Sequence, residues 1–158
     1  MSRHRATWPA PFKPGRILLV DDDNLVAVNT RALLDQAGYY CDRARSLRQA
    51  RALLAGRCHN LVLLDHNLPD GTGADLLHPL ADQAPETAVI YLTAMPPAHL
   101  EHVRRCPLVR EVLMKPVDRA ELIQTIQRHA PRTCPAGAPS IITRQERLDL
   151  LALLPATG

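Results

Sequence analysis

The chain has 158 residues, of which 46% are hydrophobic and 3% aromatic, so we expect one domain with an aliphatic core and a short extension. Its 19 basic and 16 acidic residues leave a net charge of +3, which does not indicate a tail that coats nucleic acid. The chain has no apolar run long enough to span a bilayer and no signal peptide, which argues against a membrane protein. Its four cysteines include no CxxC pair, which argues against a disulfide framework and a cysteine metal site. Together these features favour the cytoplasm.

After a flexible arm at residues 1–14, strand-like and helix-like segments alternate five times. Gly38 follows the first predicted helix, where a glycine commonly ends one, and a capping box from Ser46 to Gln49 opens the second. The expected elements are, in chain order, a strand at Ile17 to Asp21, a helix at Leu25 to Ala37, a strand at Tyr39 to Arg43, a helix after Ser46, a strand at Asn60 to Asp65, a helix with Leu76 to Ala84 on its inner face, a strand at Thr87 to Thr93, a short helix at Ala98 to Arg105, a strand at Arg110 to Met114 and a helix capped by Asp118.

The strict alternation of strands and helices predicts an α/β fold, a doubly wound five-stranded parallel sheet covered by helices on both faces. We expect this domain to span residues 15–130. Residues 131–140 are rich in proline, glycine and alanine and predict a linker, and residues 141–158 predict a C-terminal amphipathic helix. Because an isolated helix of this length is unstable in water, it must dock on its own domain, on a partner chain or on something else.

Four of the predicted strands end abruptly in charged or hydroxyl side chains. The first ends in the acid pair Asp21 and Asp22, the third in Asp65, the fourth in Thr93 and the fifth in Lys115. Because ligands bind at the carboxyl edge of open α/β sheets, we expect these side chains to converge on one site.

Carboxylates that converge in this way need a cation, because two of them about 4 Å apart repel by about 4 kcal/mol at an effective dielectric constant of about 20. Their oxygens suit Mg²⁺, which often bridges carboxylate and phosphate. A carboxylate can also be the nucleophile of phosphoryl transfer, and an ammonium and a hydroxyl can stabilise the charge of the transferred group. Lys115 is one of only two lysines, which favours a role that arginine could not fill. The sequence therefore predicts a phospho-aspartate site.

The strings ILLVDDD, LVLLD, VIYLTA and VLMKP stand in this order between Gly15 and Ala130, and through them the chain resembles the receiver domains of two-component response regulators. The resemblance implies a flavodoxin-like fold with strand order 2-1-3-4-5. Carried over position by position, the implied roles are Asp65 as phosphoacceptor, Asp21, Asp22 and Asp65 as ligands of Mg²⁺ or Mn²⁺, Asn67 as a further ligand through its backbone carbonyl, Thr93 as switch hydroxyl, Lys115 as phosphate-binding lysine and Pro116 as the residue after a cis bond.

The resemblance also implies a signalling domain and not an enzyme, apart from self-catalysed phosphorylation and dephosphorylation. A histidine kinase or phosphotransfer protein would donate the phosphoryl group, and the domain would change its affinity for a downstream partner protein or for a second copy of itself. We expect no contact with a membrane. We also expect no direct binding of nucleic acid by the chain as given, because no recognition helix remains before its last residue.

Two further features concern output. Val112 stands three residues before the lysine, where the family usually has an aromatic switch residue; Tyr91, on the strand face of Thr93, is expected either to belong to the core or to substitute in part. A basic surface, either solvated or a docking patch for an acidic partner, is predicted from Arg43, Arg45, Arg48, Arg51 and Arg57.

Two alternatives stay open. Asp21 and Asp23 are spaced like the nucleophile and acid of haloacid-dehalogenase-type phosphatases, although Leu25 and a single Asp118 fit that family poorly. The segment Ile142 to Arg147 is similar to the start of a helix-turn-helix domain, so the chain could be the receiver fragment of a transcription regulator.

Overall fold

The structure, a computed structural model of the chain, describes residues 15–130. The expected arm at 1–14, the linker at 131–140 and the C-terminal helix at 141–158 lie outside the described residues. Within residues 15–130, no helix is long and apolar enough to cross a membrane.

A five-stranded parallel sheet forms the centre of the domain, in the order β2-β1-β3-β6-β7. The predicted doubly wound α/β fold is therefore confirmed, together with the strand order that the family resemblance implied. Each strand boundary lies within one residue of its predicted position. The strands are β1 (Arg16–Val20), β2 (Tyr40–Ala44), β3 (Leu61–Asp65), β6 (Ala88–Thr93) and β7 (Val109–Met114), and a separate antiparallel pair consists of β4 (Asn67–Leu68) and β5 (Gly71–Thr72).

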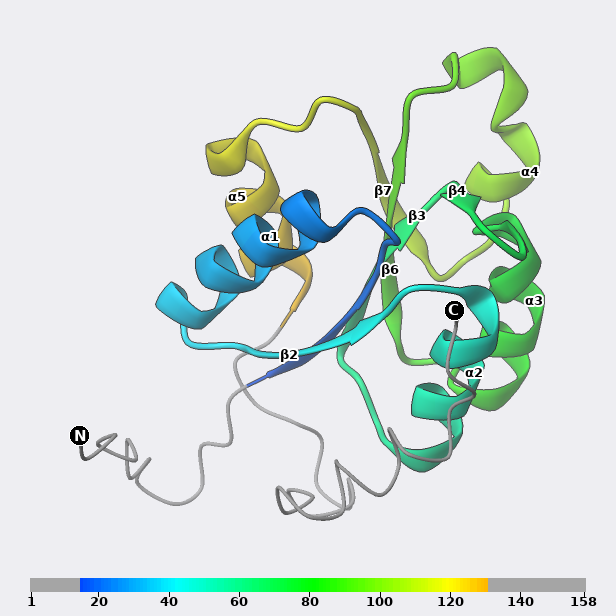
Figure 1. Cartoon of the computed structure of the whole chain (residues 1–158). Helices are drawn as coiled ribbons and strands as arrows, with labels where there is room; N and C mark the ends of the chain where they lie inside the picture. The colour runs from blue at the N-terminus through cyan, green and yellow to red at the C-terminus, as the bar shows by residue number, and fades with distance from the viewer. Residues whose placement is uncertain (1–14, 131–158) are drawn as a thin grey trace.

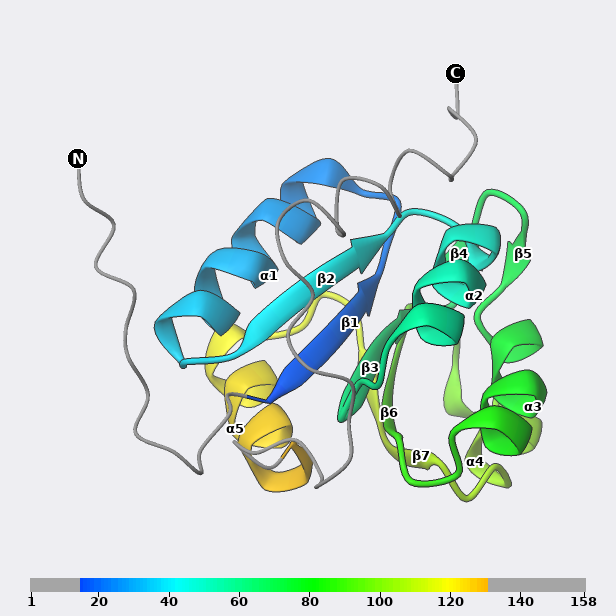
Figure 2. The same ribbon diagram turned by 90° about the horizontal axis from the view of Figure 1, so that it is seen from below.

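Helices cover both faces of this sheet (Figures 1 and 2). One face carries α1 (Asn24–Gln36) and α5 (Arg119–His129), and the other carries α2 (Leu47–Gly56), α3 (Ala74–Gln83) and α4 (Glu101–Arg104). The buried apolar residues divide accordingly into two clusters, one on each face. The central strand β3 is buried throughout, as expected for a parallel sheet with both faces covered.

Short-range signals in the sequence set most helix ends. The side chains of Asp23, Ser46 and Asp118 cap α1, α2 and α5 by accepting backbone N–H bonds of 2.9 to 3.2 Å. Gly38 follows α1 with a φ of +85°, a left-handed conformation that suits glycine. The predicted caps at Ser46 and Asp118 and the stop at Gly38 are confirmed, whereas the cap at Asp23 was not predicted.

The helix predicted from Ala98 to Arg105 is not continuous. A single turn of 3₁₀ helix, η1 (Pro97–His99), precedes α4, and the Leu100 N–H bonds to the Pro97 carbonyl at 3.1 Å. The adjacent prolines at 96 and 97 have no N–H to donate, and they favour a tight first turn over an extended α-helix. This connection between β6 and β7 therefore contains a shorter α-helix than the sequence predicted.

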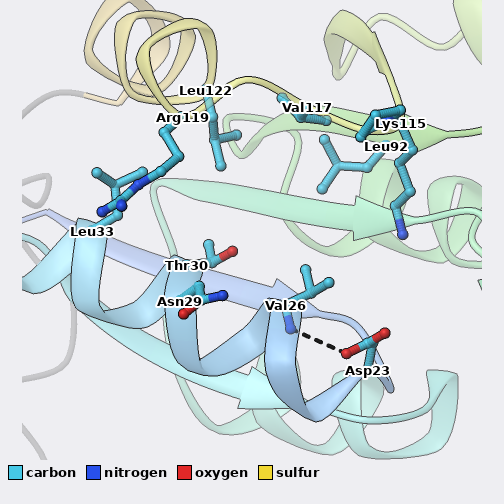
Figure 3. A pocket seen from close by; sticks show the side chains of 11 residues that line it. Asp23, Val26, Asn29, Thr30, Leu33, Leu92, Lys115, Val117, Arg119 and Leu122 are labelled. Carbon is cyan, nitrogen blue, oxygen red and sulfur yellow. Dashed lines mark hydrogen bonds between the residues drawn. The ribbon is translucent and has the colours of Figure 1, made fainter.

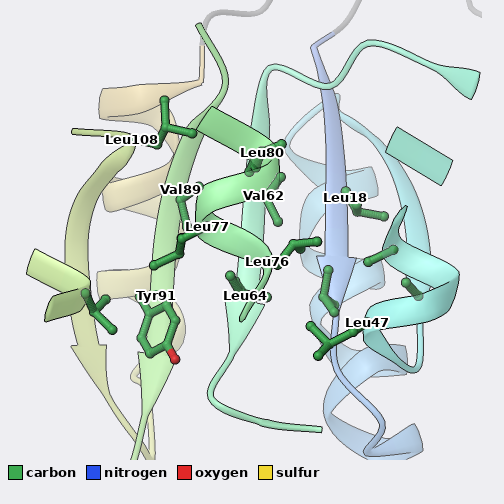
Figure 4. Close-up of a cluster of buried hydrophobic side chains, with 14 of the residues drawn as sticks. Leu18, Leu47, Val62, Leu64, Leu76, Leu77, Leu80, Val89, Tyr91 and Leu108 are labelled. Carbon is green, nitrogen blue, oxygen red and sulfur yellow. The ribbon is translucent and has the colours of Figure 1, made fainter. Parts of the chain in front are cut away.

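Aliphatic side chains fill the core on both faces, and full burial of each leucine contributes about 1.5 to 3 kcal/mol. Figure 4 shows the cluster beneath α2, α3 and α4, with Tyr91 near the end of β6. This core makes a close-packed frame for the strand ends. Its labelled members are Leu18, Leu47, Val62, Leu64, Leu76, Leu77, Leu80, Val89, Tyr91 and Leu108.

A buried polar cluster surrounds Asp42 in β2. Its carboxylate accepts a hydrogen bond from Arg57 at 3.1 Å, lies 3.0 Å from His59 Nε2, and lies 3.9 Å from Arg16 Nε. Burial opposes the charged carboxylate, but the His59 hydrogen bond and the charges of His59, Arg57 and Arg16 outweigh it and lower the pKa of Asp42 to about 2. Arg57 is only 6% exposed, so the prediction that it belongs to a basic surface is wrong.

Candidate functional site

Three carboxylates lie close together at the carboxyl edge of the sheet. One oxygen from each of Asp21, Asp22 and Asp65 lies within 4.8 Å of the others. Asp21 and Asp65 are buried, whereas Asp22 is exposed. The pairing of β1 with β3 brings the acid pair and the single acid together, because both strands end at this edge. Such a set of hard oxygens can hold a divalent cation.

The turn that carries the acid pair is fixed from two sides. Asp21 Oδ1 accepts a 2.9 Å hydrogen bond from the Asp23 N–H, and the Asp23 side chain caps α1. From β2, the Arg43 guanidinium donates to the Asp21 carbonyl oxygen through Nε at 3.3 Å and Nη2 at 3.2 Å, and to Asn24 Oδ1 at 3.0 Å. Arg43 therefore holds the turn that carries Asp21 and Asp22, a contact that the sequence did not indicate.

Lys115 joins the fifth strand to the acidic cluster. Its Nζ lies 2.9 Å from Asp65 Oδ1 and 3.6 Å from Asp21 Oδ2, and its N–H bonds to the Thr93 carbonyl at 2.8 Å. Burial disfavours the ammonium, but the hydrogen bond and charge of Asp65 and the charge of Asp21 outweigh it and raise the pKa of Lys115 above 10.5. The lysine is therefore a fixed positive charge beside Asp65, and the peptide between it and Pro116 is cis.

The surroundings of the Asp21 carboxylate disfavour its charge. Burial raises the pKa of its carboxyl above 3.8; the Asp23 N–H and Lys115 oppose this rise, and the charges of Asp65 and Asp22 add to it. Asp21 Oδ2 is buried, makes no hydrogen bond within 3.5 Å and lies 3.6 Å from the Lys115 ammonium. A buried carboxylate oxygen without a hydrogen bond is unfavourable, and a metal ion bound to the three acids would reduce that penalty. The residues present therefore fit a divalent metal ion.

Thr93 and Asn67 complete the predicted set. Thr93 is fully buried at the end of β6, where its Oγ1 accepts a 2.9 Å hydrogen bond from the Met95 N–H. Asn67 lies in β4, two residues after Asp65, with its side chain exposed. The β4–β5 turn beyond it is tied to α2, because the Asp70 carboxylate accepts hydrogen bonds from the backbone N–H groups of residues 47 and 48 at 2.8 and 3.0 Å.

Sequence reasoning missed a hydrogen bond beside the site. His66 Nδ1 lies 2.6 Å from the hydroxyl of Tyr91, and the two rings meet edge to face with centroids 5.8 Å apart. Tyr91 is fully buried in the core cluster, which confirms the prediction that it belongs to the core. Its neighbour across the β6–β7 ladder is Val112, which is half-buried against the same cluster. The only signal in the sequence was a polar aromatic two residues before Thr93.

A pocket of about 640 Å³ borders the site between α1 and α5 (Figure 3). Lys115 and Asp23 lie on opposite sides of its opening, and the Asp23 carboxylate accepts the Val26 N–H. Apolar side chains line its walls, among them Val26 and Leu33 of α1, Leu122 of α5 and Val117 from the segment before α5. Close by on α1, Leu25 and Val28 are 71% and 64% exposed. The site therefore lies next to an apolar surface.

The strand order and the grouping of three acids, a hydroxyl and a lysine at one sheet edge define the class of receiver domains. The sequence profile of the response regulator receiver domain matches residues 17–127, and the chain belongs to this family. It is the receiver domain of two-component response regulators that the resemblance predicted.

Curated relatives are longer than this chain. It is 34% identical over 149 residues to the transcriptional regulatory protein CpxR of Klebsiella pneumoniae, an alignment that covers 89% of this chain and 61% of CpxR. It is 40% identical over 82 residues to the alginate biosynthesis transcriptional regulatory protein AlgB of Pseudomonas aeruginosa, covering 52% of this chain and 18% of AlgB. The chain thus spans less than two thirds of the length of these relatives.

Solved structures show the same fold. The signal receiver domain of an HD domain-containing protein from Pseudomonas fluorescens Pf-5 superposes with a TM-score of 0.70 at 30% identity, over 78% of this chain and 91% of that one. A CheY-like response regulator receiver domain from Methanospirillum hungatei JF-1 gives a TM-score of 0.70 at 27% identity, over 73% and 93% of the two chains.

The phosphatase alternative gains no support. It required the Asp23 carboxylate as a catalytic acid beside Asp21, but this carboxylate caps α1 by accepting the N–H groups of Leu25 and Val26. The family match over residues 17–127 agrees with the receiver and not with a phosphatase.

Proposed function

We propose that Asp65 accepts a phosphoryl group from a histidine kinase or a phosphotransfer protein, in a reaction that depends on Mg²⁺ and that Mn²⁺ also supports. One observation carries the proposal: Asp65 Oδ1 lies 2.9 Å from the Lys115 ammonium, within a cluster of three carboxylates. In the transfer, an Asp65 oxygen attacks phosphorus, the phosphorus–nitrogen bond of the donor histidine breaks, and the electron pair of that bond returns to the imidazole.

The acid pair and Asp65 would hold the metal ion, with Asp22 as a direct ligand and the Asn67 carbonyl as a further one. The Oδ2 of Asp21, which is buried and makes no hydrogen bond, supports this assignment. When bound, the ion neutralises charge on the transferred group and on the surrounding carboxylates. Arg43 supports the arrangement from outside, because its two hydrogen bonds to the Asp21 carbonyl orient the turn without contacting the carboxylates.

Lys115 and Thr93 bind the phosphoryl group after transfer. The ammonium already contacts Asp65, so it is placed to pair with a phosphoryl oxygen on that side chain. The Thr93 hydroxyl accepts a bond from the Met95 N–H and keeps its own proton free to donate. A phosphoryl group brings a charge of about −1.5 to −2, with which the ammonium can pair and to which the hydroxyl can donate a hydrogen bond. We infer that they are the first groups to sense phosphorylation.

The phosphodonor protein would dock beside the site. The exposed Leu25 and Val28 and the pocket next to Lys115 form an apolar surface within reach of Asp65, and such exposed patches commonly mark protein contacts. Downstream partners are a target protein or a second copy of the chain. We expect no membrane contact and a cytoplasmic location, since the phosphodonor and the metal ion are found there.

A second candidate is that the chain is the receiver part of a transcription regulator. The names of AlgB and CpxR support it, because both are transcriptional regulatory proteins that extend beyond the part this chain covers. In that case DNA binding would belong to a further domain, and the phosphoryl group on Asp65 would control it.

Labelling with phosphoramidate, a small phosphodonor, tests the proposal directly. The chain with Mg²⁺ is expected to gain one phosphoryl group that mass spectrometry locates on Asp65, and Asp65→Asn is expected to gain none while keeping its circular dichroism spectrum. Asp35→Asn, at an exposed position on α1, is the matched control and should label like the wild type. Label on the same peptide of Asp65→Asn, or steady turnover of phosphomonoesters by the wild type, would refute the assignment.

A further inference from the structure

His66, the residue directly after Asp65, is held at three points. Its N–H donates to the Leu92 carbonyl at 2.9 Å, its carbonyl accepts the Gly73 N–H at 2.8 Å, and its ring Nδ1 lies 2.6 Å from the Tyr91 hydroxyl. The first contact belongs to the sheet and the second closes the β4–β5 hairpin. Only the third is made by side chains. It connects the residue after the acceptor to the interior of the domain.

The Tyr91 hydroxyl joins three elements. It meets His66 after β3, it lies at the end of β6, and it accepts a backbone hydrogen bond from Ala74 in the first turn of α3. Burial raises the pKa of Tyr91 to about 12, so the phenol keeps its proton at neutral pH. The phenolic oxygen can donate and accept, so it can bond to His66 Nδ1 and to the Ala74 N–H at the same time.

There is little free space around this contact. A Cβ added to Gly73 would lie 2.3 Å from the Asp65 carbonyl oxygen and 3.1 Å from Tyr91 Cε2, so the hairpin, the acceptor backbone and the tyrosine ring already touch. Because the packing at Gly73 is close, we expect a shift of the backbone at Asp65 and His66 to move the ring or to break its hydrogen bond.

The ring reaches the helices that cover this face of the sheet. It belongs to one buried cluster with residues of α3 and of the η1–α4 connection, and Val112 packs on the same cluster from β7. Val112 has no polar group, so it cannot report on the site through a hydrogen bond. The cluster members from the two helical segments are Leu76, Leu77, Leu80, Leu100 and Val103.

We propose that the His66–Tyr91 hydrogen bond is the link through which the state of Asp65 reaches the packing of α3 and α4. The link rests on the proposed phosphorylation of Asp65. Both residues are positioning residues: His66 follows the backbone of the acceptor, and Tyr91 transfers that displacement to the core cluster. The bonded and the broken forms of this contact are the two arrangements that phosphorylation selects between.

Variants of the full chain test the link. Tyr91→Phe removes the hydroxyl and keeps the ring, and His66→Ala removes the other partner at a half-buried position. Tyr39→Phe is the matched control, because its hydroxyl also makes a buried hydrogen bond, to the Ala130 carbonyl at 3.2 Å, but on the opposite face. Each protein is treated with Mg²⁺ and phosphoramidate, mass spectrometry locates the label, and amide hydrogen exchange is followed over η1, α4 and β7. Urea unfolding verifies that each variant is folded.

On labelling, wild type and Tyr39→Phe are expected to change their exchange rates over α4. Tyr91→Phe and His66→Ala are expected to carry the same label with a change about fivefold smaller, the factor of one hydrogen bond of ordinary net strength. The double variant is expected to lose no more than either single one, because both changes remove the same bond.

The possible failures are distinguishable. If Tyr91→Phe is labelled at Asp65 and responds like the wild type, the link is wrong and the proposed function stands. If Tyr39→Phe loses the response equally, the effect is general loosening of the core and the link is again wrong. If the wild type takes no label at Asp65, the proposed function is wrong and the link falls with it.

Discussion

Asp42→Asn is expected to destabilise the domain more than any change at an exposed acid, although it lies outside the candidate site. The wild-type carboxylate is 7% exposed and is paired with Arg57 and His59 at 3.1 and 3.0 Å. The amide that replaces it carries no charge and leaves the buried guanidinium of Arg57 without its counterion. Removing one partner of a buried ion pair costs about 3 to 5 kcal/mol in general.

The pKa of Asp42 gives the part of this effect that depends on pH. The drop from the ordinary value of 3.8 to about 2 corresponds to about 2 kcal/mol of stability at neutral pH, at about 1.4 kcal/mol for each unit. Because the folded state has the lower pKa, this contribution is complete above the unfolded-state value and is lost as the pH falls through the folded-state value. At a pH of about 3, roughly half of it remains.

Urea unfolding at neutral pH and at a pH of about 3 measures both parts. At neutral pH the variant is expected to unfold with a midpoint about 2 M lower than the wild type, for a loss of about 3 kcal/mol and a slope of about 1.5 kcal/mol per M. At the lower pH the difference is expected to narrow by about 1 kcal/mol. Asp82→Asn is the matched control, because Asp82 pairs with His78 at 3.3 Å on the exposed surface of α3. Its expected loss is below about 0.5 kcal/mol.

Two results would refute this reasoning. A loss of less than about 1 kcal/mol for Asp42→Asn would show that the buried cluster contributes no more than a surface pair. A difference between wild type and variant that stays the same at both pH values would show that the carboxylate of Asp42 titrates alike in the folded and unfolded states.

The remaining predictions concern the site. Arg43→Met is expected to weaken Mg²⁺ binding about fivefold in calorimetry, because the turn loses charged hydrogen bonds, whereas the exposed Arg45→Met should bind as the wild type does; equal affinities for the two variants would contradict this. Gly73→Ala is expected to destabilise the domain by about 2 kcal/mol or more in urea unfolding, since its Cβ would lie 2.3 Å from the Asp65 carbonyl oxygen, and a loss within error would count against the close approach. Lys115→Arg is expected to be labelled by phosphoramidate but to impair output in a reporter strain, because the planar guanidinium misplaces the charge; wild-type output would defeat the idea.

Most of the site could be predicted from local sequence, because a parallel sheet places the ends of its strands at one edge. Asp21, Asp65, Thr93 and Lys115 each follow an apolar run, and the registers of β1, β3, β6 and β7 bring them together. The caps at Ser46 and Asp118 were equally predictable, since a cap involves residues only three positions apart. In both cases the geometry of regular secondary structure fixes where the interacting residues lie.

Contacts between side chains of different elements could not be predicted. Arg57 was assigned to the surface with four other arginines because nothing near it in sequence indicates that Asp42, 15 residues earlier, is its partner. His66 and Tyr91 are 25 residues apart and meet only because β3 and β6 are neighbours. The one available signal was a polar residue in a strand: Asp42 and Tyr91 each carry a polar group on a face that the fold covers with helices, and such groups need partners.

Two of the three acids that are buried within residues 15–130, Asp42 and Asp21, have pKa shifts in opposite directions. Around Asp42, two arginines and a histidine pair with the carboxylate and lower its pKa to about 2, so this carboxylate contributes stability, although Arg57 Nε and Nη2 and His59 Nδ1 are buried without a hydrogen bond. Around Asp21, burial and two neighbouring acids raise the pKa, and Oδ2 makes no hydrogen bond within 3.5 Å but lies 3.6 Å from Lys115 Nζ. The proposed metal ion would reduce the cost of burying the Asp21 carboxylate, and the opposite directions of the two pKa shifts agree with a stabilising role for Asp42 and the proposed metal-binding role for Asp21.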